Sequence, residues 1–340
     1  MQIMKASALV AALCSAAAMS SSANAQGEDK FYAGRTITIV IGFGPGGTYD
    51  YYARLVARHI GKHIAGKPNV VAQQMPGAGS LTAANFLYAV APKDGTSLGM
   101  LSQTLAIEEA IGNPGVKYKS AQMSWIGRAT SIAQIQLSMA TSKFSTIEDV
   151  KKAEATAAGT GAGSPTEGYP KLLNGTAGTR FRIVGPYPGS VDGLLALERG
   201  EVDTALTSYN TIKARRADWI AEKKINVLVT YSMKRHPELP QVPAFPELGK
   251  TEVDKRLLEF YVSAEEVGRS FVAPPGLPPE RVTTLRTAFM AMVGDADFLA
   301  EAAKAKAELD PLAGEELQKI IVQTVNAPRA MISRMRALLK

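Results

Sequence analysis

Four short glycine-rich segments, each ending in Ser or Thr, carry the groups in this sequence best suited to binding a small molecule. They occupy residues 44–48, 76–80, 159–164 and 186–190. Each follows a run typical of a strand and precedes apolar residues at helical spacing. Glycine lets the backbone approach a ligand closely, and the start of a helix presents free N–H groups and a partial positive charge. The chemistry expected of such turns is the binding of an anion.

Hydrogen bonds from backbone N–H groups and hydroxyls can hold a carboxylate without an arginine. Each bond to a charged group contributes about 1.5 to 3 kcal/mol, and micromolar affinity corresponds to roughly −8 kcal/mol, so about five such bonds suffice even after ordering costs. One turn of this kind is better explained as a tight turn and nothing more. Four turns in the same place between strand and helix favour ligand binding.

The first turn also matches a nucleotide-binding pattern. Residues 42–47 read G-x-G-x-x-G after a strand and before a helix, which is the dinucleotide fingerprint. That fingerprint needs an acidic residue about 20 positions further on, but Gln73 and Gln74 stand there, and Pro45 interrupts the turn. The spacing also resembles a phosphate loop, whose lysine is missing. No nucleotide or other cofactor is therefore predicted.

Residue types that could catalyse a reaction or bind a metal are few and scattered. His59 and His63 lie four apart, as zinc ligands can. Ile60 occupies the place of the metalloprotease glutamate, so both histidines are predicted to lie on an exposed helix face. Cys14 is the only cysteine of the sequence, and it lies within residues 1–25. We therefore predict no catalytic residue, no metal site and no disulfide, and we do not expect an enzyme.

Four other side chains could reach a ligand. Asp50 follows the first turn, where it could equally cap the helix, and Arg128 could serve either a site or a structural ion pair. Tyr187 and Tyr209 come just after predicted strands, where their rings could close over a bound molecule. Plain packing explains these two tyrosines equally well.

Strands and helices must position these groups, and the sequence alternates between the two. Apolar, often β-branched runs at residues 36–41, 181–184 and 225–231 predict strands. Strands alternating with helices indicate an α/β fold with a mostly parallel sheet in each lobe. Crossovers near residues 130 and 235 predict two lobes. Their limits are residues 26–130 and 236–340 for the first lobe, and 131–235 for the second.

Composition and charge are those of a soluble, exported protein. The 340 residues are enough for two domains, and the 46% hydrophobic and 20% charged residues exclude disorder of the whole chain. The formal charge of +7 is scattered without a basic, aromatic-interleaved stripe, which argues against nucleic-acid binding. A charged start, the apolar run 6–19 and the small residues Ala23 and Ala25 form a signal-peptide pattern. Residues 1–25 are thus predicted to be removed by cleavage between Ala25 and Gln26, which places the mature protein in the periplasm.

Taken in order, these motifs resemble the Bug-type receptors of tripartite tricarboxylate transporters. The opening block is residues 39–50, IVIGFGPGGTYD, followed by ARL at 53–55. The order and spacing of the blocks are specific, and together they cover nearly all of the chain after residue 25. The later blocks are residues 76–79, 91–96, 159–164, 186–190, 200–203, 239–249 and 272–276.

The resemblance implies a two-lobed periplasmic binding protein of type II, a Venus flytrap, that is a monomer and holds a small organic mono- or dicarboxylate between its lobes. It also implies transient docking on the membrane subunits of a transporter. An extracytoplasmic sensor that signals to a membrane kinase is the alternative, and the identity of the acid stays open. Combined with the candidates above, the predicted ligand-binding residues are Phe43, Gly46, Gly47, Thr48, Asp50, Gly77, Ala78, Gly161, Ala162, Gly163, Ser164, Tyr187, Gly189, Ser190, Tyr209 and Asn210.

Overall fold

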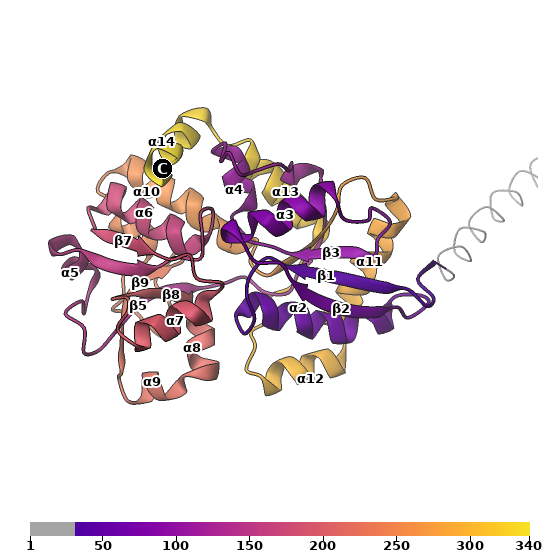
Figure 1. Ribbon diagram of the computed structural model, residues 1–340, viewed down its shortest axis with the longest axis horizontal. Coiled ribbons are helices and arrows are strands. Elements are labelled where there is room, and N and C mark those ends of the chain that lie inside the picture. The colour runs from indigo at the N-terminus through magenta and orange to yellow at the C-terminus, as the bar shows by residue number, and fades with distance from the viewer. Residues whose placement is uncertain (1–30) are drawn as a thin grey trace, which may run out of the picture.

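The structure of the protein, a computed structural model, describes residues 31–340 and divides into two lobes that meet at one junction (Figure 1). Within this described part, no helix is both long and apolar enough to cross a lipid bilayer. The predicted signal peptide of residues 1–25, its cleavage between Ala25 and Gln26, and Cys14 lie outside the described residues.

The first lobe is built on a six-stranded sheet with the order β11-β4-β10-β3-β1-β2. Strands β1, β2 and β3 are parallel, whereas β10 runs antiparallel to β3 and β4, and β11 runs antiparallel to β4. Helices cover both faces of this sheet, which is why β1 is a nearly continuous apolar run. The strands are β1 (Thr36–Ile41), β2 (Asn69–Gln74), β3 (Ser97–Met100), β4 (Ser124–Arg128), β10 (Ser270–Ala273) and β11 (Leu312–Ala313).

The second lobe holds five shorter strands. β6 pairs in parallel with β7, and β5 lies antiparallel between β8 and β9. A bridge between Ala157 and Thr204 joins the two sets of strands. The predicted two-lobed α/β fold is confirmed. The prediction of a mostly parallel sheet in each lobe is wrong, because β10, β11 and β5 pair antiparallel with their neighbours and make the sheets mixed. The strands are β5 (Gln134–Met139), β6 (Ala155–Ala158), β7 (Phe181–Val184), β8 (Ala205–Ser208) and β9 (Ile225–Tyr231).

Helices of the first lobe form two layers around its sheet (Figure 1). α2, α11 and α12 pack on one face around Phe271 and Phe289, and α3, α4 and α13 pack on the other around Trp125 and Leu317. All four of these side chains are almost fully buried, so each layer has its own core. The helices are α2 (Thr48–His59), α3 (Leu81–Ala89), α4 (Leu105–Ala110), α11 (Pro279–Val293), α12 (Ala296–Lys304) and α13 (Gly314–Val325).

The second lobe repeats this arrangement. Its first core cluster gathers α5, α6, α10 and α14 around Tyr169 and Phe245, and its second gathers α7, α8 and α9 around Leu194 and Trp219. The helices are α5 (Ile147–Lys152), α6 (Pro165–Ala177), α7 (Ser190–Glu198), α8 (Tyr209–Arg215), α9 (Ala217–Ala221), α10 (Glu252–Val262) and α14 (Arg329–Leu339).

The packing of α10 and α14 bears on the lobe limits. Both helices fall within residues 236–340, which the sequence pattern assigned to the first lobe, but Leu258 of α10 and Met335 of α14 are buried in the core cluster of the second. We therefore infer that the chain returns to the first lobe after α10 and crosses once more between α13 and α14. In Figure 1, the yellow α14 lies beside α10 and α6.

Two crossover segments run side by side at the junction. The backbone N–H of Ala129 donates to the carbonyl oxygen of Arg269 at 3.0 Å, and the N–H of Arg269 donates to the carbonyl oxygen of Thr130 at 2.9 Å. This pairing fixes Arg269 where the two lobes meet.

Candidate functional site

The four glycine-rich turns meet in two pairs across the junction. In the first pair, the N–H of Gly44 donates to the carbonyl oxygen of Pro188 at 2.9 Å. In the second pair, the backbones of Gly79 and Gly161 are so close that a Cβ on Gly161 would lie 2.8 Å from the Gly79 nitrogen. Neither Gly79 nor Gly161 has room for a side chain. The first pair encloses a cavity, whereas the second is packed backbone against backbone.

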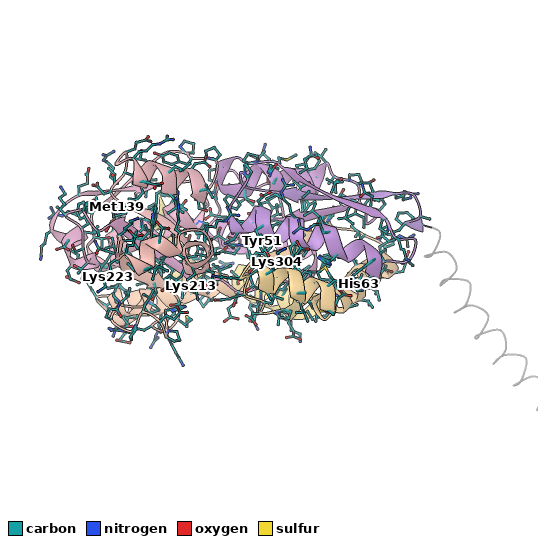
Figure 2. All side chains as sticks on the ribbon, turned by 90° about the horizontal axis from the view of Figure 1, so that it is seen from below. Tyr51, His63, Met139, Lys213, Lys223 and Lys304 are labelled. Carbon is teal, nitrogen blue, oxygen red and sulfur yellow. The ribbon has the colours of Figure 1, made fainter. Side chains whose placement is uncertain are left out.

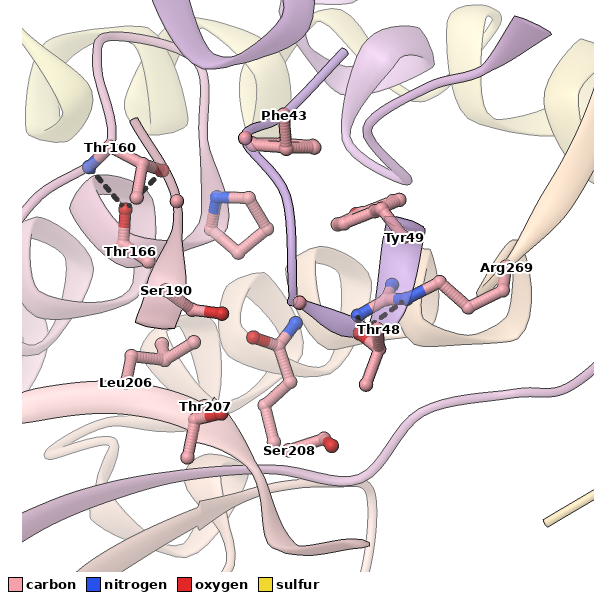
Figure 3. A pocket seen from close by; sticks show the side chains of 15 residues that line it. Phe43, Thr48, Tyr49, Thr160, Thr166, Ser190, Leu206, Thr207, Ser208 and Arg269 are labelled. Carbon is pink, nitrogen blue, oxygen red and sulfur yellow. Dashed lines mark hydrogen bonds between the residues drawn. The ribbon is translucent and has the colours of Figure 1, made fainter. Parts of the chain in front are cut away.

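The cavity at the first pair has a volume of about 40 Å³, room for about three water molecules. Side chains from both lobes face it (Figure 3). None of its lining residues, all within the described chain, is acidic, and one is a cation. The lining residues are Phe43, Gly44, Gly47, Thr48, Tyr49, Gln134, Thr160, Pro165, Thr166, Gly189, Ser190, Leu206, Thr207, Ser208 and Arg269.

Three helices begin at this cavity. α2 begins at Thr48, α7 at Ser190 and α6 at Pro165, and all three residues line the cavity. The start of each helix carries a partial positive charge and N–H groups without helical partners, which favours a negative ligand. The Ser190 hydroxyl makes no hydrogen bond to the rest of residues 31–340 and so remains available to a ligand.

The turn at residues 159–164 reaches the cavity through Thr160, which lies within the turn, and Thr166, which follows it. The Thr166 hydroxyl oxygen accepts the Thr160 N–H at 2.8 Å, and it lies 2.9 Å from Thr160 Oγ1 and 2.7 Å from Ser164 Oγ. This cluster of hydroxyls fixes the start of α6 against the cavity (Figure 3).

Arg269 is the cation of the cavity, and it is only 3% exposed. Its Nε and Nη2 donate to Thr48 Oγ1 at 2.9 and 2.8 Å, and its Nη1 donates to Gln103 Oε1 at 2.7 Å. The guanidinium carbon lies 3.7 Å from the centre of the Tyr49 ring, a cation–π contact. Throughout residues 31–340, no carboxylate forms an ion pair with it. A buried cation without an anion is costly, so this side chain attracts a negative ligand.

Gln103 also connects Arg269 to a buried carboxylate, that of Glu265. The Glu265 carboxylate accepts hydrogen bonds from Gln103 Nε2 at 2.7 Å, from Gln134 Nε2 at 3.0 Å and from the Tyr169 hydroxyl. Burial raises the pKa of Glu265 from 4.5 to about 7, although the bond from Tyr169 and the charge of Arg269 lower it. These hydrogen bonds between Arg269, Gln103 and Glu265, and from Gln134 and Tyr169 to Glu265, join both lobes beneath the cavity.

Five of the predicted ligand-binding residues come together at the cavity. They are Phe43, Gly47, Thr48, Gly189 and Ser190. Two more, Gly46 and Asn210, line an adjoining cavity of about 180 Å³ that shares Gly47 and Thr48 with the first.

Six others lie at or near the second pair of turns. Ala162, Gly163 and Ser164 line a separate cavity of about 300 Å³ next to α6 and the end of α14. Gly77 and Ala78 are exposed and do not line that cavity. The Ala78 Cα lies 3.2 Å from the position of a Cβ on Gly161, the sixth of these residues.

The last three support the structure around the cavity. Asp50 is buried beneath the first turn, where its carboxylate accepts the Gly46 N–H at 2.9 Å and the Arg54 Nε–H at 2.7 Å, so it positions that turn. Tyr187 and Tyr209 pack in the second core cluster of the second lobe.

The predicted exposure of the two histidines is wrong for His59. This residue is buried because α12 packs on α2, and its Nε2 lies 2.6 Å from Glu301 Oε2. His63 is partly buried, with Nε2 3.6 Å from Asp295 Oδ2. Over the described residues, no group of three or more His, Cys, Asp and Glu side chains is placed to hold a metal ion.

Arg128, a candidate for the site, is a structural residue near the lobe junction. Its Nη2 donates to the Asp310 carboxylate at 2.8 Å, and its Nη1 donates to the carbonyl oxygen of Glu266 at 2.5 Å. It does not line the cavity.

The predicted set of ligand-binding residues missed all of the other lining residues, above all Arg269 and Gln134. Arg269 is a lone cation directly before the buried strand β10, and Gln134 is the polar first residue of the apolar strand β5. A charged or amide side chain next to a buried strand is the one local signal that marks them. The residues missed are Gly44, Tyr49, Gln134, Thr160, Pro165, Thr166, Leu206, Thr207, Ser208 and Arg269.

Comparison with known proteins identifies a family. The model of the tripartite tricarboxylate transporter family receptor matches residues 52–337. The UPF0065 protein in the tcbD-tcbE intergenic region of Pseudomonas sp. (strain P51) is 30% identical over 234 residues, which cover 67% of each chain. The UPF0065 protein in the gbd 5' region of Cupriavidus necator is 26% identical over 322 residues, 92% of this chain and 90% of that one.

Solved structures share the fold. The periplasmic binding protein BugD superposes with a TM-score of 0.71 at 23% identity, covering 90% of this chain and 98% of its own. MatC from Rhodopseudomonas palustris with bound malate gives 0.66 at 21% identity over 90% and 99%. Another R. palustris protein, with adipate, gives 0.69 at 20% identity over 89% and 97%. The resemblance drawn from the sequence motifs is confirmed.

Proposed function

The chain belongs to the receptor family of tripartite tricarboxylate transporters, and we propose that it captures a small organic carboxylate between its lobes in the periplasm and delivers it to the membrane subunits of such a transporter. One observation carries the proposal. The cavity at the first pair of turns combines the starts of three helices with the buried guanidinium of Arg269 and has no acidic lining residue.

Electrostatics at this cavity select for an anion. A neutral guest leaves the buried Arg269 guanidinium with no carboxylate in direct contact, whereas an acidic ligand supplies one. Hydrogen bonds from Arg269, from the Ser190 hydroxyl and from the N–H groups that open α2 and α7 each contribute about 1.5 to 3 kcal/mol. Four or five of them reach roughly the −8 kcal/mol of micromolar binding.

Ligand binding and lobe closure are coupled in this proposal. Thr48 belongs to the first lobe and Ser190 to the second, so a ligand held by both stabilises the arrangement in which the lobes touch. The membrane subunits would then recognise the closed, loaded form. Two proteins of the same fold are described with malate and with adipate, which supports a small carboxylate as the guest. We propose a receptor and assign no reaction to the site.

Two experiments test the proposal. Native mass spectrometry of the freshly purified protein should show a small acid bound one to one, and calorimetry with mono- and dicarboxylates of two to eight carbons should find micromolar binders. Uptake of the tightest binder by cells that lack this receptor should be restored by the wild-type chain. If no carboxylate in this panel binds, the assignment of the cavity is wrong. If a carboxylate binds but its uptake by cells does not depend on this protein, the proposed delivery to the membrane subunits is wrong.

A further inference from the structure

A second cavity, of about 180 Å³, adjoins the first on the outer side of the first turn. We call it the outer cavity and the 40 Å³ space the inner cavity. Gly47 and Thr48 border both, so the first turn forms the wall between them. The outer cavity is also walled by both lobes, with Tyr51 from the first and Asn210 from the second.

The outer cavity is positively charged. Arg215, from α8 of the second lobe, and Lys306, which follows α12 in the first lobe, both line it, and no acidic residue of the described chain does. Arg215 Nη1 lies against the first turn, 3.5 Å from the position of a Cβ on Gly46. Neither the Arg215 nor the Lys306 side chain has a hydrogen bond or ion pair to any part of residues 31–340.

The absence of partners for Arg215 contrasts with its neighbour on the same helix. Lys213 forms ion pairs with Glu238 at 2.7 Å and, across the junction, with Glu308 at 3.5 Å. Figure 2 shows Lys213 and Tyr51 on the two sides of the junction. The two cations Arg215 and Lys306 thus face the same space without an acceptor.

Closure of the lobes brings Arg215 and Lys306, which carry like charges, to one cavity, and their repulsion opposes it. An anion between the two cations outweighs their repulsion, because each cation is then attracted to an opposite charge. Both side chains are exposed, so the effect is moderate and depends on salt.

We propose that the outer cavity binds a second acidic group of the same ligand, so that the protein takes dicarboxylates in preference to monocarboxylates. The inner cavity has room for about three water-sized groups, which is roughly one carboxylate. The chain of the acid then passes the first turn, and its far carboxylate lies between Arg215 and Lys306. This inference rests on the proposed function, because Arg269 and the helix starts must hold the first carboxylate.

Matched pairs of acids test the inference. Calorimetry at low ionic strength would compare succinate with butyrate and adipate with hexanoate, on the wild-type protein and on the double variant Arg215→Gln, Lys306→Gln. The wild type should bind at least one dicarboxylate ten or more times more tightly than its matched monocarboxylate. In the double variant that ratio should fall below three, while monocarboxylate affinity stays within twofold. The wild-type ratio should also shrink in 0.5 M salt, because exposed charges are screened.

The control removes the same charge nearby. Lys304 lies two residues before Lys306 but does not line the outer cavity, and Lys223 is an exposed cation of the second lobe. The double variant Lys223→Gln, Lys304→Gln should keep the wild-type ratio. A ratio near one in the wild type, or a ratio that survives Arg215→Gln with Lys306→Gln, overturns the outer site and leaves the proposed function standing. If none of the four acids binds the wild type, and no other carboxylate does, both proposals fall.

Discussion

The two pairs of glycine-rich turns look alike in sequence and differ in what they enclose. Gly44 and Pro188 meet through one backbone hydrogen bond at the edge of a cavity lined by hydroxyls and a guanidinium. Gly79 and Gly161 meet with no space between their backbones. The first pair can therefore hold a ligand, while the second brings the lobes together.

The difference comes from what surrounds the glycines. At the first pair, the turns lead directly into α2 and α7 and lie beside the crossover segment that carries Arg269. At the second pair, the turn at 159–164 presents its glycines to the other lobe, and Thr166, at the start of α6, faces the inner cavity instead. A glycine turn before a helix is thus insufficient to define an anion site.

The largest expected effect comes from Arg269. Arg269→Gln keeps a donor near Thr48 but removes the buried positive charge at the first pair of turns. Loss of one charge-assisted interaction costs about 3 kcal/mol, or roughly a hundredfold in affinity. Calorimetry with the tightest acid of the panel measures the loss, and a thermal melt of the unliganded variant checks that it folds. Affinity within fivefold of the wild type would show that the ligand lies away from the first pair.

Glu265, beneath the cavity, should make stability depend on pH. Because its pKa rises from 4.5 in the unfolded chain to about 7 in the folded protein, the folded state holds a proton that the unfolded state releases between these values. The contribution of Glu265 to stability is therefore full below about pH 4.5 and is lost as pH rises through about 7. The total change is about 3 kcal/mol.

Chemical denaturation at several pH values would isolate this contribution. The stability of Glu265→Gln relative to the wild type should rise between about pH 4.5 and 7 and then level off, because glutamine does not ionise. Glu266→Gln, which changes an exposed side chain next to it, should show no such rise. Parallel curves for Glu265→Gln and the wild type would contradict the raised pKa.

Sequence patterns predicted the scaffold better than the site. The strands at 181–184 and 225–231 were predicted with the bounds observed, because apolar runs with turn residues at both ends reflect local preferences. α10 escaped prediction, and the lobe that α10 and α14 join depends on which core their apolar faces reach. Contacts of that kind are tertiary and leave no periodic signal in a single chain.

The same distinction applies to the site. Thr48 and Ser190 were predicted because they end glycine turns, which is a local feature. Arg269 and Gln134 reach the cavity only because crossover segments far apart in the chain pair there, through the bonds that join Arg269 to Ala129 and Thr130. Spacing along the sequence could not reveal that these two segments lie side by side in the folded protein.

A smaller effect is expected at Ser190, and it tests the first pair directly. Ser190→Ala deletes a hydroxyl that faces the inner cavity and has no partner elsewhere in the described chain. Loss of a single donor to a carboxylate should weaken binding about tenfold, or about 1.5 kcal/mol. Calorimetry measures it, and the melting temperature of the unliganded protein should stay the same. Unchanged affinity would remove Ser190 from the site.

The smallest effect on affinity is expected at the second pair. Gly163 has φ of +89°, and a Cβ there would lie 3.3 Å from the Glu108 side chain. Gly163→Ala should therefore cost about 1 to 2 kcal/mol of stability through backbone strain, measured by denaturation. Its affinity for the acid should stay within threefold of the wild type, because Gly163 lines the separate 300 Å³ cavity and not the inner one.

Ala162→Ser is the matched control for that variant, since Ala162 is exposed, lines the same separate cavity and has no positive φ. It should change neither stability nor affinity, which separates the strain at Gly163 from any effect of added polar surface. If Ala162→Ser strengthens binding fivefold or more, the assignment of the ligand to the first pair of turns is contradicted. A hydroxyl gained there could help only a ligand held beside α6 and α14, and the second pair of turns would then be the binding site.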